Sequence, residues 1–278
     1  MIVCKELNKS FDNKEQLFKA LRDNAKDIIS IKKATIQKSI DKGLSVKAKS
    51  LNIYLKENDS VKALPFEIDE KYYYIAVNST RVLDSHKDLH LDKLWNKSTK
   101  DMQGKVYLLD THQLTLKTTI VKKEEIEMFT AIVPFSAIGK SYSGDTEVLI
   151  YKFLKSKVRD LDIKDWLDSG DDIEASVKMR YTDIALAMKS EAKEDEEYLK
   201  TFNDYNGIIA NKEDFEEEIL YFWAIKQAMN VHESSLVPFG SNGATGQIQS
   251  EDKAQLKNTL ENKEQSNDTQ KANVFIKF

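Results

Sequence analysis

The stretch Asp172-Ile-Glu-Ala-Ser-Val-Lys-Met-Arg-Tyr181 alternates polar and apolar side chains over its whole length. A period of two is typical of a β-strand with one face on a core. The apolar residues of this strand face one side, and Glu174, Ser176 and Lys178 face the other. Ser176 therefore lies off the apolar face, where a nucleophilic hydroxyl would have to be.

The segments on both sides of this strand indicate the fold class. Runs rich in β-branched and aromatic residues predict further strands, at 1–7, 46–55, 71–78, 106–116, 127–133, 146–151 and 231–239. Amphipathic spacing predicts helices after Asp12 or Asn13 as N-cap, and at 91–100, 152–168 and 214–230. Strands and helices mix without regular βαβ alternation. This order favours an α+β fold with a curved β-sheet or barrel core flanked by helices.

The segment 214–230 has the most pronounced helical pattern of the chain. Its large apolar residues recur mainly at three- and four-residue spacing and form a broad stripe; they include Phe215, Ile219, Phe222, Trp223 and Ile225. An aromatic stripe of this kind is typical of a core helix. We therefore expect a buried helix here, directly before the strand 231–239.

Composition excludes several classes of protein. With 9 Gly and 3 Pro among 278 residues the chain is not collagen-like, and its single Cys cannot form a disulfide scaffold. The 42 Lys and Arg are interspersed with 46 Asp and Glu, without the basic stripe of a nucleic-acid partner. No apolar run approaches membrane-spanning length, and the N-terminus lacks a signal-peptide pattern. We expect no nucleic-acid or membrane partner and a cytoplasmic location.

Charge and apolar content divide the chain into three parts. Residues 1–45 read as an N-terminal strand and helical extension, and 46–242 as the main domain. Within that domain, 187–212 is rich in charge and reads as a surface insert between two strands. Residues 243–278 are almost free of large apolar side chains until the last few, which predicts a flexible, largely disordered tail.

The chain has only four histidines, which limits the search for a catalytic base or metal ligand. His86-Lys-Asp-Leu-His90 lacks the Glu of a metalloprotease motif. On a strand, however, Asp84, His86, Asp88 and His90 would face one way, so a metal-dependent hydrolase stays open as an alternative. The Gly139-Lys-Ser141 run has Pro134 where a phosphate-binding loop needs its first Gly, and no dinucleotide fingerprint exists. We expect neither a cofactor nor a metal.

Two further segments carry side chains suited to nucleophilic catalysis. The apolar run 106–109 leads to His112, and the segment beginning at 231 carries His232 and Glu233 side by side. Adjacent residues of an extended strand point to opposite faces, so only one of this pair can face a common site.

Taken in order, these segments resemble the motifs of prohead proteases of tailed bacteriophages, capsid-maturation serine proteases related to the herpesvirus assemblins. The resemblance covers about Tyr72 to Asn242, in the version of large Bacteroidetes-infecting phages. Lys178 stands where that family usually has a small residue, and the segment 187–230 is longer than usual. The matching motifs are Asp84–Asp88, Leu108-Leu-Asp-Thr-His112, Ala175-Ser-Val-Lys-Met179 and Glu233-Ser-Ser-Leu-Val-Pro-Phe-Gly-Ser-Asn242.

The resemblance implies an assemblin-like fold and a serine endopeptidase. Ser176 would be the nucleophile and His112 its general base, with backbone N–H groups as the oxyanion hole. The third member of the site, which orients the imidazole, stays open between His232 and Glu233, with Asp84 or Asp88 as further alternatives.

The resemblance also implies substrates and a location. The substrates would be the major capsid protein, the scaffold and the protease itself, inside the assembling procapsid in the host cytoplasm, and the protease could be a homodimer. The alternative is a catalytically degenerate protease fold that serves as a scaffold or capsid-assembly factor. A His112–Ser176 separation well beyond the ~3 Å reach of a general base would favour that alternative.

Overall fold

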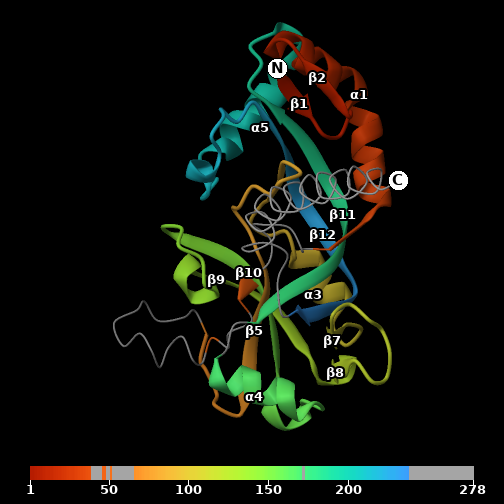
Figure 1. The fold of residues 1–278 in the computed structure, drawn as a ribbon, viewed down its shortest axis with the longest axis vertical. Helices are drawn as coiled ribbons and strands as arrows, with labels where there is room; N and C mark the ends of the chain where they lie inside the picture. The colour runs from red at the N-terminus through yellow and green to blue at the C-terminus, as the bar shows by residue number, and fades with distance from the viewer. Residues whose placement is uncertain (39–45, 48–50, 52–65, 171–172, 238–278) are drawn as a thin grey trace, which may run out of the picture. The chain divides into compact units, whose positions relative to one another are not determined.

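The computed structural model describes residues 1–38, 46–47, 51, 66–170 and 173–237. The described residues all lie in one compact unit, Met1–Gly240. This unit is an α+β structure in which a curled, half-barrel β-sheet carries helices (Figure 1). The predicted boundaries at 45/46 and 242/243 adjoin residues outside the described ranges and stay predictions.

Four α-helices and twelve strands lie wholly within the described residues, together with five short 3-10 helices. The helices are α1 (Lys14–Ala34), α3 (Asn96–Asp101), α4 (Leu161–Ser169) and α5 (Glu196–Asn206). The strands are β1 (Ile2–Cys4), β2 (Lys9–Phe11), β3 (Ile36–Lys38), β4 (Val46–Lys47), β5 (Tyr72–Ser79), β6 (Asp88–His90), β7 (Tyr107–Asp110), β8 (Thr119–Val121), β9 (Glu127–Pro134), β10 (Asp145–Leu154), β11 (Glu174–Met188) and β12 (Tyr221–Val237).

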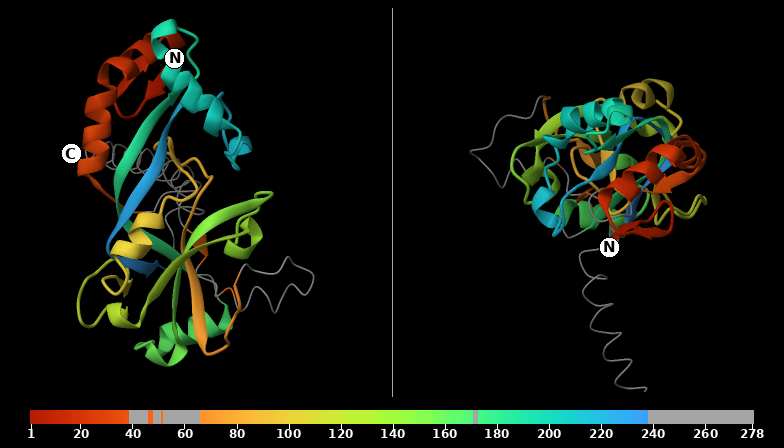
Figure 2. Two further views of the ribbon diagram at one scale, coloured as in Figure 1. Left: turned by 180° about the vertical axis from the view of Figure 1, so that it is seen from behind. Right: turned by 90° about the horizontal axis from the view of Figure 1, so that it is seen from above.

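Two long antiparallel strands, β11 and β12, form the centre of the larger sheet. Its order is β3-β11-β12-β7-β8, with β4 also paired to β11 and β6 to β12. Strand β12 runs parallel to β6 and β7 and antiparallel to β11. Figures 1 and 2 show β11 and β12 side by side from both directions. Strand β12 therefore lies between β11, which carries Ser176, and β7, which leads to His112.

A second sheet and the N-terminal helix complete the core. Strands β5, β10 and β9 form an antiparallel sheet with β10 in the middle. Helix α1 begins after Asn13, whose side chain accepts a hydrogen bond from the N–H of Gln16 at 2.9 Å, as an N-cap does. The core that joins α1 to both sheets includes Leu17, Leu21, Ile75, Leu108, Val177 and Trp223.

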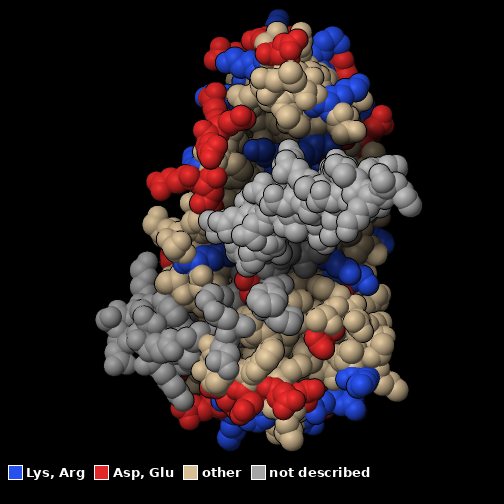
Figure 3. Space-filling model, in the orientation of Figure 1, with Lys and Arg blue, Asp and Glu red and all other residues tan. Residues whose placement is uncertain are grey.

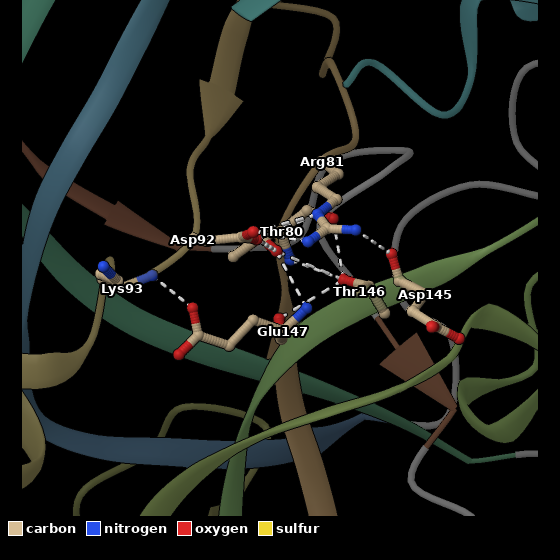
Figure 4. A network of polar contacts seen from close by, with 7 residues as sticks. All are labelled: Thr80, Arg81, Asp92, Lys93, Asp145, Thr146 and Glu147. Carbon is tan, nitrogen blue, oxygen red and sulfur yellow. Dashed lines mark hydrogen bonds and ion pairs between the residues drawn. The ribbon is translucent and has the colours of Figure 1, made fainter. Parts of the chain in front are cut away.

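A polar network ties the end of β5 to the start of β10 (Figure 4). Arg81 binds the carboxylate of Asp92 through Nε and Nη2, and its Nη1 donates to the carbonyl oxygen of Asp145 at 2.8 Å. The hydroxyl of Thr146 donates to the carbonyl oxygen of Thr80 at 2.9 Å. These contacts satisfy polar groups where the pairing of β5 with β10 ends, so the network stabilises the fold. Its remaining members are Lys93 and Glu147.

Both signs of charge occur across the face that Figure 3 shows, with acidic side chains gathered near α5. Helix α5 carries Glu196 and Glu197 in its first turn. No helix in the described ranges is long and apolar enough to cross a membrane.

The structure confirms most of the predicted strands. Strand β11 covers the alternating stretch, and Ala175, Val177 and Met179 are each 0% exposed. The opposite face of this strand departs from the expectation, because Ser176 is also 0% exposed. The predicted strand 46–55 and the tail fall largely or wholly outside the described residues.

The predicted helix at 214–230 is wrong. Residues from Tyr221 onward belong to β12, which continues without a break to Val237. The first five residues of β12, Tyr221–Ile225, are all buried, because this central strand is covered on both faces. A strand buried on both faces has a continuous apolar run, and such a run produces matches to helical spacing.

Two other predicted helices are shorter than expected. In 152–168, the first residues belong to β10, a short 3-10 helix spans Lys155–Lys157, and the only α-helix is α4. In 91–100, helix α3 begins at Asn96.

Segment 187–212 does contain a helix between two strands, α5, but Phe202 on that helix is buried against Phe222 of β12. The insert therefore contributes to the apolar packing of the unit.

Candidate active site

Ser176 lies on β11 opposite Ser235 of β12, in direct register. Directly opposed residues of an antiparallel pair project from the same face of the sheet. Glu233 precedes Ser235 by two residues on β12, and its carboxylate accepts a hydrogen bond from the Ser235 hydroxyl at 3.0 Å. The sheet thus brings two hydroxyls and one carboxylate together on one face.

His112 reaches this face through a turn after β7. The parallel register pairs Asp110 with Leu236, and the next two residues, Thr111 and His112, have φ angles of 51° and 59°. This left-handed region is costly for residues other than Gly, by about 1–2 kcal/mol each. The turn directs the imidazole back over β12, and Nε2 of His112 lies 2.7 Å from Oγ of Ser176.

An irregularity in β12 aims Glu233 at the imidazole. Asn230 pairs with Met179 and Ser234 with Val177, so three residues of β12 stand against one residue of β11. Such a bulge redirects side chains locally. Both carboxylate oxygens of Glu233 lie 3.0 Å from Nδ1 of His112, and Glu233 is 2% exposed.

His232, the residue before Glu233 in this bulge, lies at the surface. His232 has a φ angle of 67° and is exposed. Of the two residues left open by the sequence, the structure places Glu233 at the imidazole and points His232 away from it. The assignment of His232 as a member of the site is therefore corrected.

The contacts of His112 define its tautomer. A buried carboxylate accepts hydrogen bonds, so the proton of the neutral imidazole lies on Nδ1, toward Glu233. Nε2 is then unprotonated and accepts a hydrogen bond from the Ser176 hydroxyl. The side chains of His112 and Glu233 are 7% and 2% exposed, and electrostatic interactions are stronger in such a water-poor site. The arrangement suits removal of a proton from Ser176.

The segment Asp84–His90 does not join this site. Asp84 accepts hydrogen bonds from the N–H groups of His86 and Asp88, at 2.9 and 2.7 Å, and so stabilises a turn. Asp88 pairs with Lys32 at 2.5 Å. The expectation that Asp84, His86, Asp88 and His90 share one strand face is wrong, since β6 spans only Asp88–His90.

The same segment offers no metal site. His90 is fully buried, and its ring nitrogens contact Asn78 and Tyr181, at 3.3 and 3.1 Å. Among the residues that the structure describes, no group of three or more His, Cys, Asp or Glu could hold a metal ion. The metal-dependent alternative therefore gains no support from the geometry.

The buried His90 predicts a pH dependence of stability. Burial, and then the charge of Lys32, lower the pKa of His90 from 6.5 to about 3. As the pH falls below about 6.5, the unfolded chain takes up a proton that the folded chain does not bind. The free energy of unfolding should then fall by up to about 1.4 kcal/mol per pH unit from this group. Urea denaturation of the wild type and His90→Gln at several pH values measures the slope, and equal slopes in this window would contradict the assignment.

Two groups of polar residues beside the site are not among the predicted site residues. The first is Ser235, which lies within the quoted motif. Asn230 and Ser234 flank the bulge, and both donate hydrogen bonds to the hydroxyl of buried Tyr151, at 2.5 and 3.0 Å. Burial raises the pKa of Tyr151, which keeps the hydroxyl neutral. The available signal was the i, i+2 spacing of Glu233 and Ser235, which predicts a shared face.

Comparison of the chain with protein-family models finds no match. Searches of curated proteins and of solved structures also find none. The resemblance to prohead proteases therefore depends on the motifs quoted above.

Proposed function

We propose that this chain is a serine endopeptidase in which Ser176 is the nucleophile, His112 the general base and Glu233 the carboxylate that orients the imidazole. One observation carries the proposal: His112 contacts Ser176 through Nε2 at 2.7 Å and Glu233 through Nδ1 at 3.0 Å. A nucleophile, a base and an orienting acid in this order form the constellation used for acyl transfer.

The proposed reaction has two halves. Oγ of Ser176 attacks the carbonyl carbon of the scissile peptide bond while Nε2 of His112 takes the hydroxyl proton. The C–N bond then breaks, and His112 returns the proton to the leaving amine. In the second half, His112 takes a proton from a water molecule that attacks the acyl-enzyme, and Ser176 leaves with that proton. Glu233 stabilises the imidazolium in both halves.

The biological setting is proposed from the motif resemblance. Four segments of the chain resemble prohead proteases in the order in which that family has them, and three of them carry Ser176, His112 and Glu233. The proposed substrates are accordingly the major capsid protein, the scaffold and the chain itself, within the procapsid.

One observation favours the alternative of a non-catalytic assembly factor. Ser176 is 0% exposed, so a peptide reaches its Oγ only after neighbouring groups move. The short Ser176–His112 distance weighs against that alternative, because a degenerate site has no need to keep a base within hydrogen-bond reach of a hydroxyl. An experiment on the hydroxyl itself separates the two functions.

The first test is reaction with a fluorophosphonate probe, followed by mass spectrometry. We expect Oγ of Ser176 to form a bond to phosphorus with loss of fluoride, and Ser176→Ala to carry no label. The second test coexpresses the chain with the major capsid protein and scaffold of the same phage. Wild type should shorten these proteins and Ser176→Ala should not. Equal cleavage by both would sink the assignment of Ser176, and absence of labelling in the wild type would favour the assembly factor.

A further inference from the structure

The hydroxyl of Ser235 contacts both His112 and Glu233. Its Oγ accepts a hydrogen bond from the backbone N–H of His112 at 2.9 Å and donates one to Oε2 of Glu233 at 3.0 Å. Ser235 is 0% exposed, so bulk water has no direct access to replace either bond. We propose that Ser235 is a positioning residue that fixes His112 and Glu233 toward Ser176. This inference rests on the proposed function.

The strand register explains why this position can do both tasks. Ser235 is the direct ladder partner of Ser176 on β11 and of Leu109 on β7. It therefore lies in the central strand, between the strand of the nucleophile and the strand that leads to the base. A side chain at this point on the shared face lies next to both neighbouring strands.

The first hydrogen bond holds the turn that carries the base. The N–H of Thr111 donates to the carbonyl oxygen of Leu236 at 3.1 Å, which continues the bonding between β7 and β12. The next N–H, that of His112, donates to the hydroxyl of Ser235. The hydroxyl thus adds one bond beyond the ladder, at a residue whose left-handed φ of 59° needs support from its surroundings.

The second hydrogen bond fixes the carboxylate. Both oxygens of Glu233 lie 3.0 Å from Nδ1 of His112, so the carboxylate can rotate about this contact and still offer an oxygen to the imidazole. The hydrogen bond from the Ser235 hydroxyl to Oε2 restricts that rotation. A fixed acceptor then fixes the Nδ1–H tautomer and the ring plane, and through them the direction of Nε2.

The chain contains a matched serine outside the site. Ser190 is 4% exposed, accepts a hydrogen bond from the N–H of Ala192 at 3.5 Å and donates one to Oδ2 of Asp195 at 2.6 Å. It has the same kind of partners as Ser235 and none of them touches His112. Ser190→Ala therefore measures the general cost of removing a buried hydroxyl.

The test compares fluorophosphonate labelling rates of purified variants. Ser235→Ala should react with the probe about ten- to a hundredfold more slowly than wild type, which corresponds to about 1.4–2.7 kcal/mol at 1.36 kcal/mol per tenfold. Ser190→Ala should react at the wild-type rate. If Ser235 acts through Glu233, Ser235→Ala combined with Glu233→Gln should be hardly slower than Glu233→Gln alone.

Proton NMR supplies a readout that a merely structural role would not change. The low-field resonance of the His112 Nδ1–H should shift or broaden in Ser235→Ala and stay in place in Ser190→Ala. A wild-type labelling rate or an unchanged resonance would each overturn the inference for Ser235, and additive effects in the double variant would overturn its action through Glu233. If the wild type is not labelled at all, the proposed function fails, and the resonance still decides whether Ser235 positions the imidazole.

Discussion

Glu233→Gln should lower kcat/KM for peptide hydrolysis by about a thousand- to ten-thousandfold, the size expected when the base of such a triad loses its correct tautomer. An amide has one oxygen, whereas both carboxylate oxygens of Glu233 are in use. The Ser235 hydroxyl and the Nδ1–H of His112 would compete for that oxygen. If the amide NH2 faces Nδ1, the imidazole proton moves to Nε2, and Ser176 loses its acceptor.

The measurement is steady-state cleavage of a peptide from the capsid-protein processing site, with the fluorophosphonate rate as a second readout. We expect the loss in kcat, with KM little changed, because Glu233 acts on the imidazole and not on bound peptide. Glu147→Gln is the matched control, since Glu147 is also a buried strand residue, 8% exposed, whose carboxylate accepts a backbone N–H. A loss of less than about tenfold in Glu233→Gln would remove Glu233 from the mechanism.

The alternation of polar and apolar residues in β11 predicts a strand, because only a strand with two distinct faces produces a period of two. The first half of β12 has the spacing of a helix for the converse reason. Its residues Tyr221–Ile225 are buried on both faces, so polar residues mark neither face and no period of two remains. Segment length does not distinguish a strand from a helix here, because β12 has 17 residues and is longer than strands usually are. Burial on both faces depends on neighbours that are distant in sequence, and local spacing does not report them.

The same distinction between local pattern and contacts distant in sequence applies to the candidate site. Ser176 and His112 were nameable from their motifs, but they are 64 residues apart, and their contact depends on the order β11-β12-β7 and on a left-handed turn. The choice between His232 and Glu233 needed the register of β12. Adjacent residues point to opposite faces, and only the pairing of Ser235 with Ser176 shows that Glu233, two residues before Ser235, shares the face of the nucleophile.

The N-terminal helix provides the largest expected effect on stability, through a buried ion pair that has no part in the proposed chemistry. Nζ of Lys32, near the end of α1, lies 2.5 Å from Oδ1 of Asp88 on β6, and the two side chains are 11% and 4% exposed. Nζ also lies 5.6 Å from the ring centre of Trp223. This pair therefore joins α1 to the central strands at a point where water does not compensate either charge.

Lys32→Met should lower the free energy of unfolding by about 3–5 kcal/mol, because it leaves the Asp88 carboxylate buried without its cation. Combining it with Asp88→Leu should recover most of this loss, since the uncompensated charge is then gone and apolar side chains fill the space. Urea denaturation at neutral pH measures all three proteins. Lys19→Met on the same helix is the control: Lys19 pairs with Asp23 at the surface, 68% and 49% exposed, and its loss should leave the unfolding midpoint unchanged. If the double variant is as unstable as Lys32→Met, the loss comes from packing around α1, and the buried charge is not its cause.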